Sequence, residues 1–412
     1  MIIIDKPFIQ TLDDKVYYQA HITDEKAGYA NDCYYVAEKE FGKYFSDEVA
    51  DAFVIGLLLP ALQSNQDIIV KAAMSEKLYY SLSNTAIFAY SKAFGYQENK
   101  IIPEQLINPK IDSFGVGTGC SLGIDSFSTI LHHTSISCEE SYKLSHLTFF
   151  NVGSLGEKNV DKVKESYQKE LENVKKFAAE INLPLISLES NLAVFFSHYD
   201  YNFNQTHVIR GMSMVLSMQK LFKKYIYSSG YPISEIHLSG IDPTYMEAML
   251  LPALSTENTE LIVGGPNQSR TDKARIISDN EMVQKYLYVC VKDLVVNNDM
   301  HYGPWVNIDE GHTRNCSGCD KCLRTMVTLD ALGKLEKYSE LFDIPKYHKL
   351  RKLFMAKIIG LRNKSFVFKD MFNLVHKESY KISMISRILS LIYQFGLNDL
   401  YYRFAGAGKN KK

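Results

Sequence analysis

The stretch of residues 114–130 (FGVGTGCSLGIDSFSTI) constrains the fold of this 412-residue chain most strongly. It begins as an apolar run interrupted by Gly115, Gly117 and Gly119, and it then passes through residues 121–126 into a helical pattern. This order predicts a strand, a tight turn and the start of a helix. Small residues at such a turn let backbone N–H groups approach an anion, and the positive end of the following helix dipole favours phosphate. We therefore expect the turn to hold a phosphate chain.

Two common phosphate loops are excluded by their spacing. A Walker A loop needs a Lys directly after its last Gly, but Gly123 is followed by Ile124 and Asp125. The dinucleotide fingerprint needs glycines at its first, third and sixth positions, and counting from Gly115 the sixth position is Cys120.

The hexapeptide SLGIDS at residues 121–126 resembles the Ser-Gly-Gly-x-Asp-Ser loop of the PP-loop ATP pyrophosphatases, which cleave ATP between its α and β phosphates. Leu122 stands where that family usually has its first Gly. The resemblance implies that Ser hydroxyls and loop amides hold the pyrophosphate and that Asp125 helps to place Mg²⁺. The nucleotide contacts that it implies are Ser121, Leu122, Gly123, Ile124, Asp125 and Ser126. An ordinary strand-to-helix turn is the alternative interpretation.

Strands and helices alternate after this loop. The expected strands are residues 146–152, 184–188, 235–239 and 261–264, and the expected helices are residues 158–181 and 206–224. This alternation predicts a parallel sheet with crossover helices, which makes the expected fold an α/β, Rossmann-like sheet with helices on both faces. Ligands in such sheets lie beyond the carboxyl ends of the strands. Asn151, Val152 and Gly153 are therefore candidate contacts with the adenine or ribose, as in PP-loop enzymes, unless they form a plain turn.

Two cations are candidate catalytic residues besides Asp125. Arg210 lies near the front of an apolar helix, where a guanidinium favours an anionic partner. A similar Arg occurs in the 7-cyano-7-deazaguanine synthases, a PP-loop family. Lys273, in the helix opened by residues 269–275, resembles the Lys of their Lys-Ala-Glu stretch, and a cation there would neutralise charge on leaving pyrophosphate. Arg270 is its competitor, and surface ion pairs or a solvated helix face are the structural alternatives.

A group of cysteines predicts a metal site. Cys316, Cys319 and Cys322 are spaced C-x2-C-x2-C on a Gly-containing turn, and structural zinc takes four nitrogen or sulfur ligands. Cys290, at the end of a strand expected over residues 286–290, is the expected fourth ligand. His301 and His312 compete with it, and an iron–sulfur cluster or unmetallated thiols are the alternatives to zinc. The isolated cysteines, expected to be core thiols, are Cys33, Cys120 and Cys138.

Targeting signals are not apparent. The start, MIIIDKPF, lacks a signal-peptide pattern, and the longest apolar run, residues 52–62, is shorter than the roughly 20 residues that span a bilayer. Seven cysteines, an odd number with three close together, argue against a disulfide framework. We therefore expect a soluble cytoplasmic protein.

Three segments are expected: an N-terminal α+β accessory or substrate domain (1–110), a PP-loop ATP-binding domain with the four-cysteine metal site (111–335), and a basic helical segment (336–412). Residues 346–412 carry 15 Lys and Arg against 3 Asp and Glu, with helices expected at 350–361 and 380–397. Such a tail is usually a solvated arm that packs on the protein. Contact with an anionic membrane surface is the first alternative interpretation, and binding of nucleic acid is a weaker one.

Across residues 111–330, the loop, Asn151, Arg210, Lys273 and the Cys cluster follow the order of the deazaguanine synthases, with Arg324 after the last Cys. Here Cys290 lies 26 positions before Cys316 rather than close to it. The resemblance implies ATP, Mg²⁺ and Zn²⁺ as cofactors. It also implies adenylation of a small-molecule or peptide carboxylate, or of an amide, followed by attack of a nitrogen nucleophile; a homodimer is compatible with it. The alternatives are ATP-dependent sulfur transfer to a nucleobase, with Cys120 as carrier, and a non-catalytic nucleotide-binding subunit.

Overall fold

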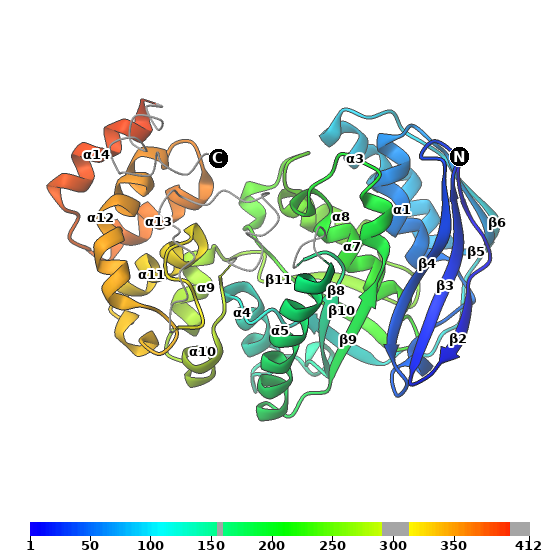
Figure 1. Cartoon of the computed structure of the whole chain (residues 1–412), viewed down its shortest axis with the longest axis horizontal. Coiled ribbons are helices and arrows are strands. Elements are labelled where there is room, and N and C mark those ends of the chain that lie inside the picture. Colours follow the sequence, from blue (N-terminus) through cyan, green and yellow to red (C-terminus); the bar gives the residue numbers. More distant parts are fainter. Residues whose placement is uncertain (155–159, 291–312, 396–412) are drawn as a thin grey trace. The chain divides into compact units, whose positions relative to one another are not determined.

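The computed structural model describes residues 1–154, 160–290 and 313–395, which form two compact units (Figure 1). The first unit comprises residues 1–120 and 129–267. The second comprises residues 121–128 and the chain from residue 268 onward. The SLGIDS hexapeptide thus belongs to the second unit, whereas the strand before it belongs to the first.

A single mixed sheet forms the centre of the first unit. Its strand order in the described part of the chain is β11-β10-β7-β8-β9-β4-β3-β1-β5-β6, with β2 paired to β3. Pairing is parallel from β11 to β9 and from β1 to β6, and antiparallel among β9, β4, β3, β1 and β2. The strands are β1 (Ile2–Ile4), β2 (Phe8–Leu12), β3 (Lys15–Asp24), β4 (Tyr29–Glu38), β5 (Ile68–Ser75), β6 (Ile101–Ile107), β7 (Gly115–Gly119), β8 (His146–Asn151), β9 (Leu185–Ser190), β10 (Phe222–Ser228) and β11 (Glu260–Gly264).

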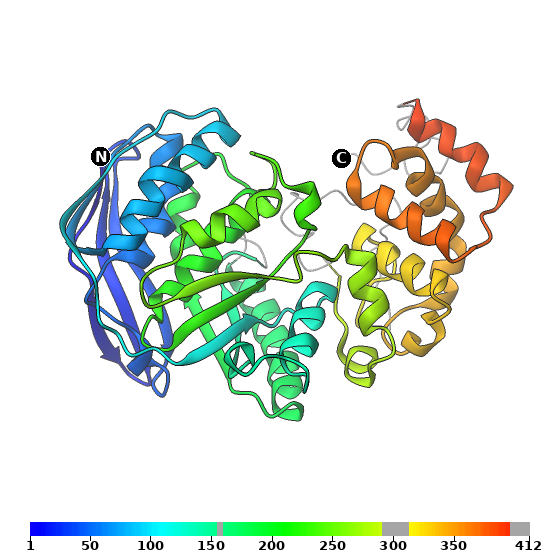
Figure 2. The ribbon, with the colours of Figure 1, turned by 180° about the vertical axis from the view of Figure 1, so that it is seen from behind.

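Helices cover both faces of this sheet, as the alternating pattern predicts (Figures 1 and 2). Phe149 stacks on Tyr167 of α5, whereas its neighbour Phe150 stacks on Tyr225 and packs into the core that contains α1 and α7. Because successive side chains of a strand point to opposite faces, α5 and the pair α1 and α7 lie on opposite sides. The α-helices of this unit are α1 (Asp51–Gln63), α2 (Glu76–Ser81), α3 (Ile87–Phe94), the later part of α4 (Ile124–His133), α5 (Val160–Glu180), α6 (Leu192–Phe196), α7 (Phe203–Ser217) and α8 (Glu247–Ala253).

The glycines of β7 are required by packing within the sheet. A Cβ added at Gly117 would lie 2.4 Å from Cε1 of Phe222, and one at Gly115 would lie 3.0 Å from the carbonyl oxygen of Leu221. A Cβ at Gly119 would meet the Tyr225 hydroxyl oxygen at 3.4 Å. The alternate glycines therefore leave one face of β7 free for the large side chains of Leu221, Phe222 and Tyr225.

The N-terminal strands are part of the same sheet. Tyr35, Val36 and Ala37 of β4 pair with residues 188–190 of β9, so antiparallel hydrogen bonds join the N-terminal part to the parallel part. The expected boundary at residue 110 is therefore not where the compact units separate.

Three local predictions are wrong. The helix expected over residues 206–224 ends at Ser217, and the sequence FKKYIYS forms β10 because it pairs with both β7 and β11. Residues 235–239 form no strand; a 3-10 helix over Ile233–Glu235 occupies the start of that stretch. Residues 286–290 are not a strand either, since Tyr286 ends helix α10.

The second unit is helical in its described residues. It contains the first turn of α4, together with α9 (Arg270–Ile277), α10 (Glu281–Tyr286), α11 (Asp320–Ala331), α12 (Ile344–Leu361), α13 (Phe366–Lys377) and α14 (Met384–Gln394). Helix α13 contacts both α9 and α11, so the basic C-terminal segment is part of this unit's packing. Within the described ranges, every helix is too short or too polar to cross a membrane.

Candidate functional site

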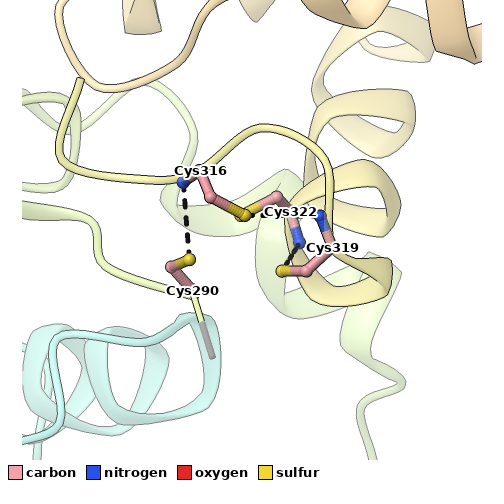
Figure 3. A group of neighbouring side chains, drawn as sticks. All are labelled: Cys290, Cys316, Cys319 and Cys322. Atoms are coloured by element: carbon pink, nitrogen blue, oxygen red, sulfur yellow. Dashed lines mark hydrogen bonds between the residues drawn. The ribbon is translucent and has the colours of Figure 1, made fainter. Parts of the chain in front are cut away.

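Four cysteines converge in the second unit (Figure 3). The Sγ atoms of Cys290, Cys316, Cys319 and Cys322 all lie within 4.8 Å of one another, and Cys316 Sγ lies 3.9 Å from Cys322 Sγ. Tetrahedral zinc with bonds of about 2.3 Å places its sulfur ligands about 3.8 Å apart. The group could therefore hold a metal such as zinc. The expected competitors His301 and His312 lie outside the described residues.

Backbone amides prepare these sulfurs for a cation. The N–H groups of Cys316, Cys319 and Cys322 donate to the sulfurs of Cys290, Cys316 and Cys319 at 3.3–3.4 Å. Hydrogen bonding from Cys290 lowers the pKa of Cys319 to about 7 and holds the pKa of Cys316 below its usual range, whereas hydrogen bonding with Cys316 raises the pKa of Cys290 and burial raises that of Cys322. Deprotonated thiolates are the form that binds metal.

Asn315 brings the distant Cys290 to the other three cysteines. Its Oδ1 accepts from the Val289 N–H at 2.9 Å, and its Nδ2 donates to the carbonyl oxygens of Leu287 (3.0 Å) and Leu341 (3.3 Å). The segment of residues 287–289 also contacts the SLGIDS hexapeptide, because the Tyr288 N–H donates to the Leu122 carbonyl oxygen at 2.8 Å. The segment that precedes Cys290 thus connects the cysteine cluster to the hexapeptide through backbone and side-chain hydrogen bonds.

The hexapeptide is closed by its own serines. Ser126 Oγ accepts from the Ser121 N–H at 3.3 Å, and Ser121 Oγ accepts from the Gly123 N–H at 3.4 Å. Leu122 has a φ of 56° in the left-handed region that favours glycine, which matches the glycine of the PP-loop pattern at this position. Its side chain is buried, which holds the residue in this conformation.

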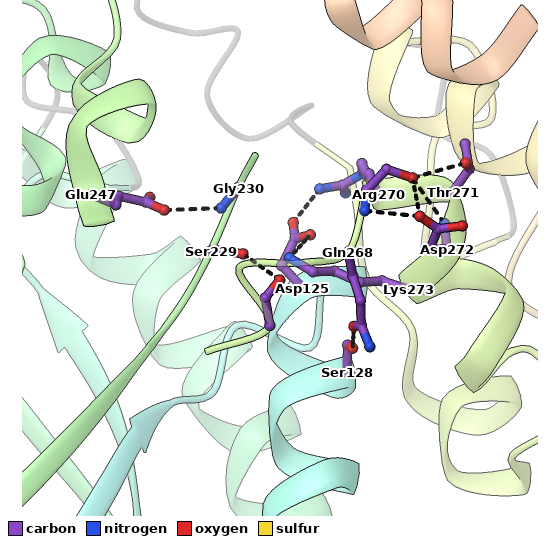
Figure 4. A network of polar contacts seen from close by, with 12 residues as sticks. Asp125, Ser128, Ser229, Gly230, Glu247, Gln268, Arg270, Thr271, Asp272 and Lys273 are labelled. Carbon is purple, nitrogen blue, oxygen red and sulfur yellow. Dashed lines mark hydrogen bonds and ion pairs between the residues drawn. The ribbon is translucent and has the colours of Figure 1, made fainter. Parts of the chain in front are cut away.

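Asp125, in the first turn of α4, lies between two cations from α9 (Figure 4). One carboxylate oxygen pairs with the Arg270 guanidinium, and Oδ1 lies 3.5 Å from the Nζ of Lys273. Only 1% of the Lys273 side chain is exposed, whereas Asp125 and Arg270 are partly open to solvent. The structure thus brings Asp125 and Lys273 together, and it adds Arg270, which the sequence argument ranked below Lys273.

Capping interactions fix the orientation of α9. Ser269 Oγ accepts from the Asp272 N–H, and Asp272 accepts in return from the Ser269 N–H. The N–H and hydroxyl of Thr271 donate to Asp370 of α13 at 3.2 and 2.9 Å. Burial raises the pKa of Asp370. These contacts hold the start of α9, and therefore Arg270 and Lys273, in one position.

Two more cations come from α11. Lys321 and Arg324 are three positions apart, which places them on one side of the helix. Burial, together with the charges of Arg270 and Arg324, lowers the pKa of Lys321 to about 8. These cations exceed the single charge of Asp125, so the group favours a multiply charged anion such as a phosphate chain. Lys321 was missed in the sequence because it stands between two cysteines of the metal motif.

The other predicted nucleotide residues lie in the first unit. Asn151 Nδ2 donates to Glu189 at 3.1 Å, and Gly153 has a φ of 100° just beyond the end of β8. Arg210 lies in the middle of α7 rather than at its front, with its guanidinium 4.0 Å from the Phe196 ring centroid and donating to the Val152 carbonyl oxygen. Its side chain is fully buried, and the predicted position near a helix start is wrong; the catalytic role of Arg210 stays a prediction.

Comparisons with protein-family models, curated proteins and solved structures found no match. Function is therefore inferred from the residues themselves.

Proposed function

We propose that this chain is an ATP-dependent adenylating enzyme of the PP-loop type, which converts ATP to AMP and pyrophosphate. The observation that carries the proposal is the placement of Asp125 between Arg270 and Lys273. An aspartate of the SLGIDS loop and two cations of a distant helix form one group, and such a group suits the pyrophosphate end of a nucleotide.

The cations have distinct roles in this proposal. Buried Lys273 faces the bond between the α and β phosphates and stabilises charge on the leaving pyrophosphate. Arg270 and Lys321 bind the outer phosphates, and the loop amides and the start of α4 bind the remaining oxygens. Asp125 keeps Arg270 and Lys273 in position before the nucleotide arrives.

A resident Mg²⁺ does not fit Asp125 as the structure has it. Both carboxylate oxygens face cations, and the described residues contain no group of three or more metal ligands besides the four cysteines. We expect Mg²⁺ to arrive with the triphosphate, where it would neutralise phosphate charge.

The reaction class is activation of a carboxylate or amide. Its oxygen attacks the α phosphorus and the bond to pyrophosphate breaks, which gives an acyl or imidoyl adenylate. A nitrogen nucleophile then attacks the activated carbon, loses a proton to solvent, and displaces AMP. Cys120, the sulfur carrier of the alternative reaction, is a buried thiol, which disfavours sulfur transfer from it.

The proposal is tested by identifying the products of nucleotide turnover by the purified, zinc-loaded chain across a panel of carboxylic acids. AMP with pyrophosphate supports adenylation, and the stimulating acid identifies the substrate class. ADP with phosphate would overturn the proposal. Tight ATP binding without turnover under any acid would favour the non-catalytic nucleotide-binding subunit.

A further inference from the structure

Helix α14 packs with its small and polar side chains inward. Ser386, Ser390 and Tyr393 are buried, and Ser386 Oγ donates to the Lys352 carbonyl oxygen of α12 at 2.9 Å. A Cβ added at Gly360 of α12 would lie 2.5 Å from Cβ of Tyr393, so the two helices are in close contact. Leu389 and Ile392 also pack against this contact, so the inward side of α14 combines serines with apolar side chains.

The opposite side of α14 is apolar and exposed. We call it the α14 apolar face; its residues are 47–76% exposed, and they are Met384, Ile385, Ile388, Leu391 and Phe395. Most of them recur at intervals of three or four residues, which places them along one side of the helix. Single exposed apolar residues are ordinary, but a continuous exposed face marks a surface that contacts something else.

The segment that contains this face is rich in cations, of which Arg351 and Lys357 pair with Asp330 and Asp320 outside it. Residues 346–395 carry 11 Lys and Arg against 2 Asp and Glu, and Lys381 and Arg387 are exposed on and next to α14. Both acids are already engaged: Asp370 accepts from Thr271, and Glu378 pairs with Arg275 at 2.7 Å. The segment therefore has a large net positive charge beside an apolar helix face.

We propose that the α14 apolar face docks on an anionic lipid bilayer. Basic helices with one apolar face lie in the interface between head groups and acyl chains, and each Lys or Arg near an anionic surface strengthens the attraction. A second copy of the chain suits the surface less well. A stable dimer buries about 800 Å² per partner, more than one short helix supplies, and pairing would bring two basic surfaces together.

The test is vesicle flotation of the full chain with phosphatidylcholine vesicles, with and without phosphatidylglycerol. The wild-type chain should float with the anionic vesicles at low salt and lose most of that binding in high salt. I388E/L391E should weaken binding at least tenfold. The matched control is I136E/I241E, at exposed positions outside α14, and it should bind as the wild type does.

Three results would overturn the proposal. One is absence of flotation with anionic vesicles, and another is equal binding by I388E/L391E and its control. The third is vesicle binding that K381E/R387E abolishes and I388E/L391E leaves unchanged, which would show that charge alone carries the binding and that the α14 apolar face has no part in it. Sedimentation velocity of the same variants without lipid adds a direct check: a wild-type dimer that I388E/L391E dissociates would assign the face to a second copy.

Discussion

The Asp125 carboxylate pairs with the Arg270 guanidinium although 145 positions separate the two residues in the sequence. Asp125 comes from the loop that resembles a phosphate-binding motif, and Arg270 begins the helix that also carries Lys273. Their contact joins two regions that lie far apart in the sequence, and it places Asp125 beside the helix that carries both proposed phosphate-binding cations.

Lys273→Met should lower the rate of AMP formation by about 100-fold or more, because it removes a buried cation that stabilises the leaving pyrophosphate. Lys273→Arg should retain part of the activity. The matched control is Arg275→Met on the same helix, which loses only the contact with Glu378 and should stay within about threefold of wild type. Equal losses for Lys273→Met and Arg275→Met in steady-state assays would refute the assigned role.

Gly117→Ala should destabilise the protein by about 1–3 kcal/mol, because its Cβ would lie 2.4 Å from the Phe222 ring. Gly119→Ala, where the nearest atom is 3.4 Å away, should change stability by less than about 0.5 kcal/mol. Urea unfolding of the two variants measures the difference. A neutral Gly117→Ala together with a Gly119→Ala variant that loses ATP binding would show that these glycines serve phosphate rather than packing.

Titration of the buried Asp51 carboxyl group should make the free energy of unfolding decrease as pH rises. Burial raises its pKa to about 6, against hydrogen bonds from Ser75 and Gln219 that lower it. The folded state therefore holds the proton more tightly than the unfolded state. The resulting stabilisation is fully present below about pH 4 and is lost as pH rises through about 6, on the order of 3 kcal/mol in total.

Asp51→Asn should remove this dependence while keeping the hydrogen bond from the Ser75 N–H. The measurement is the free energy of unfolding of wild type minus that of the variant, from urea titrations between pH 4 and 7. The exposed Asp14→Asn serves as the control. A difference that does not change across this range would contradict the prediction.

Cys316→Ser should abolish stoichiometric metal binding, because it removes a sulfur that contacts Cys322 and accepts from the Cys319 amide. Elemental analysis should find about one zinc in the wild type and in Cys138→Ser. Loss of metal should lower the unfolding temperature by about 10 °C, since the four cysteines join residue 290 to residues 316–322. If the analysis instead finds iron, together with the visible absorption of a cluster, the four cysteines hold an iron–sulfur cluster rather than zinc.

The sequence predicts the parts of this molecule that depend on local signals. The glycine-interrupted strand β7, the start of α4, strands β8, β9 and β11, and helix α5 all match their expected places within a few residues. Cys290 was chosen from chemistry alone, and the structure groups it with the other three cysteines.

Features set by contacts between distant segments were not predictable in this way. The sequence FKKYIYS is also compatible with the end of a helix. It forms β10 because it pairs with β7 on one side and with β11 on the other. No local pattern announces that β4 pairs with β9, or that Asn315 bridges residues 287–289 and Leu341. The contact between the Arg210 guanidinium and the Phe196 ring was not predictable, because nothing in the spacing of the two residues indicates it.

The most direct test of the proposed PP-loop chemistry is quantitative detection of AMP and pyrophosphate from ATP, comparing wild type with Asp125→Asn and Asp279→Asn. Asp125→Asn should reduce AMP formation by about 100-fold or more, because it releases Arg270 and Lys273 from their common partner. Asp279→Asn, which changes only the ion pairs with Lys334 and Lys337, should retain most of the activity. AMP formation that is unchanged in Asp125→Asn would contradict the assignment of this site.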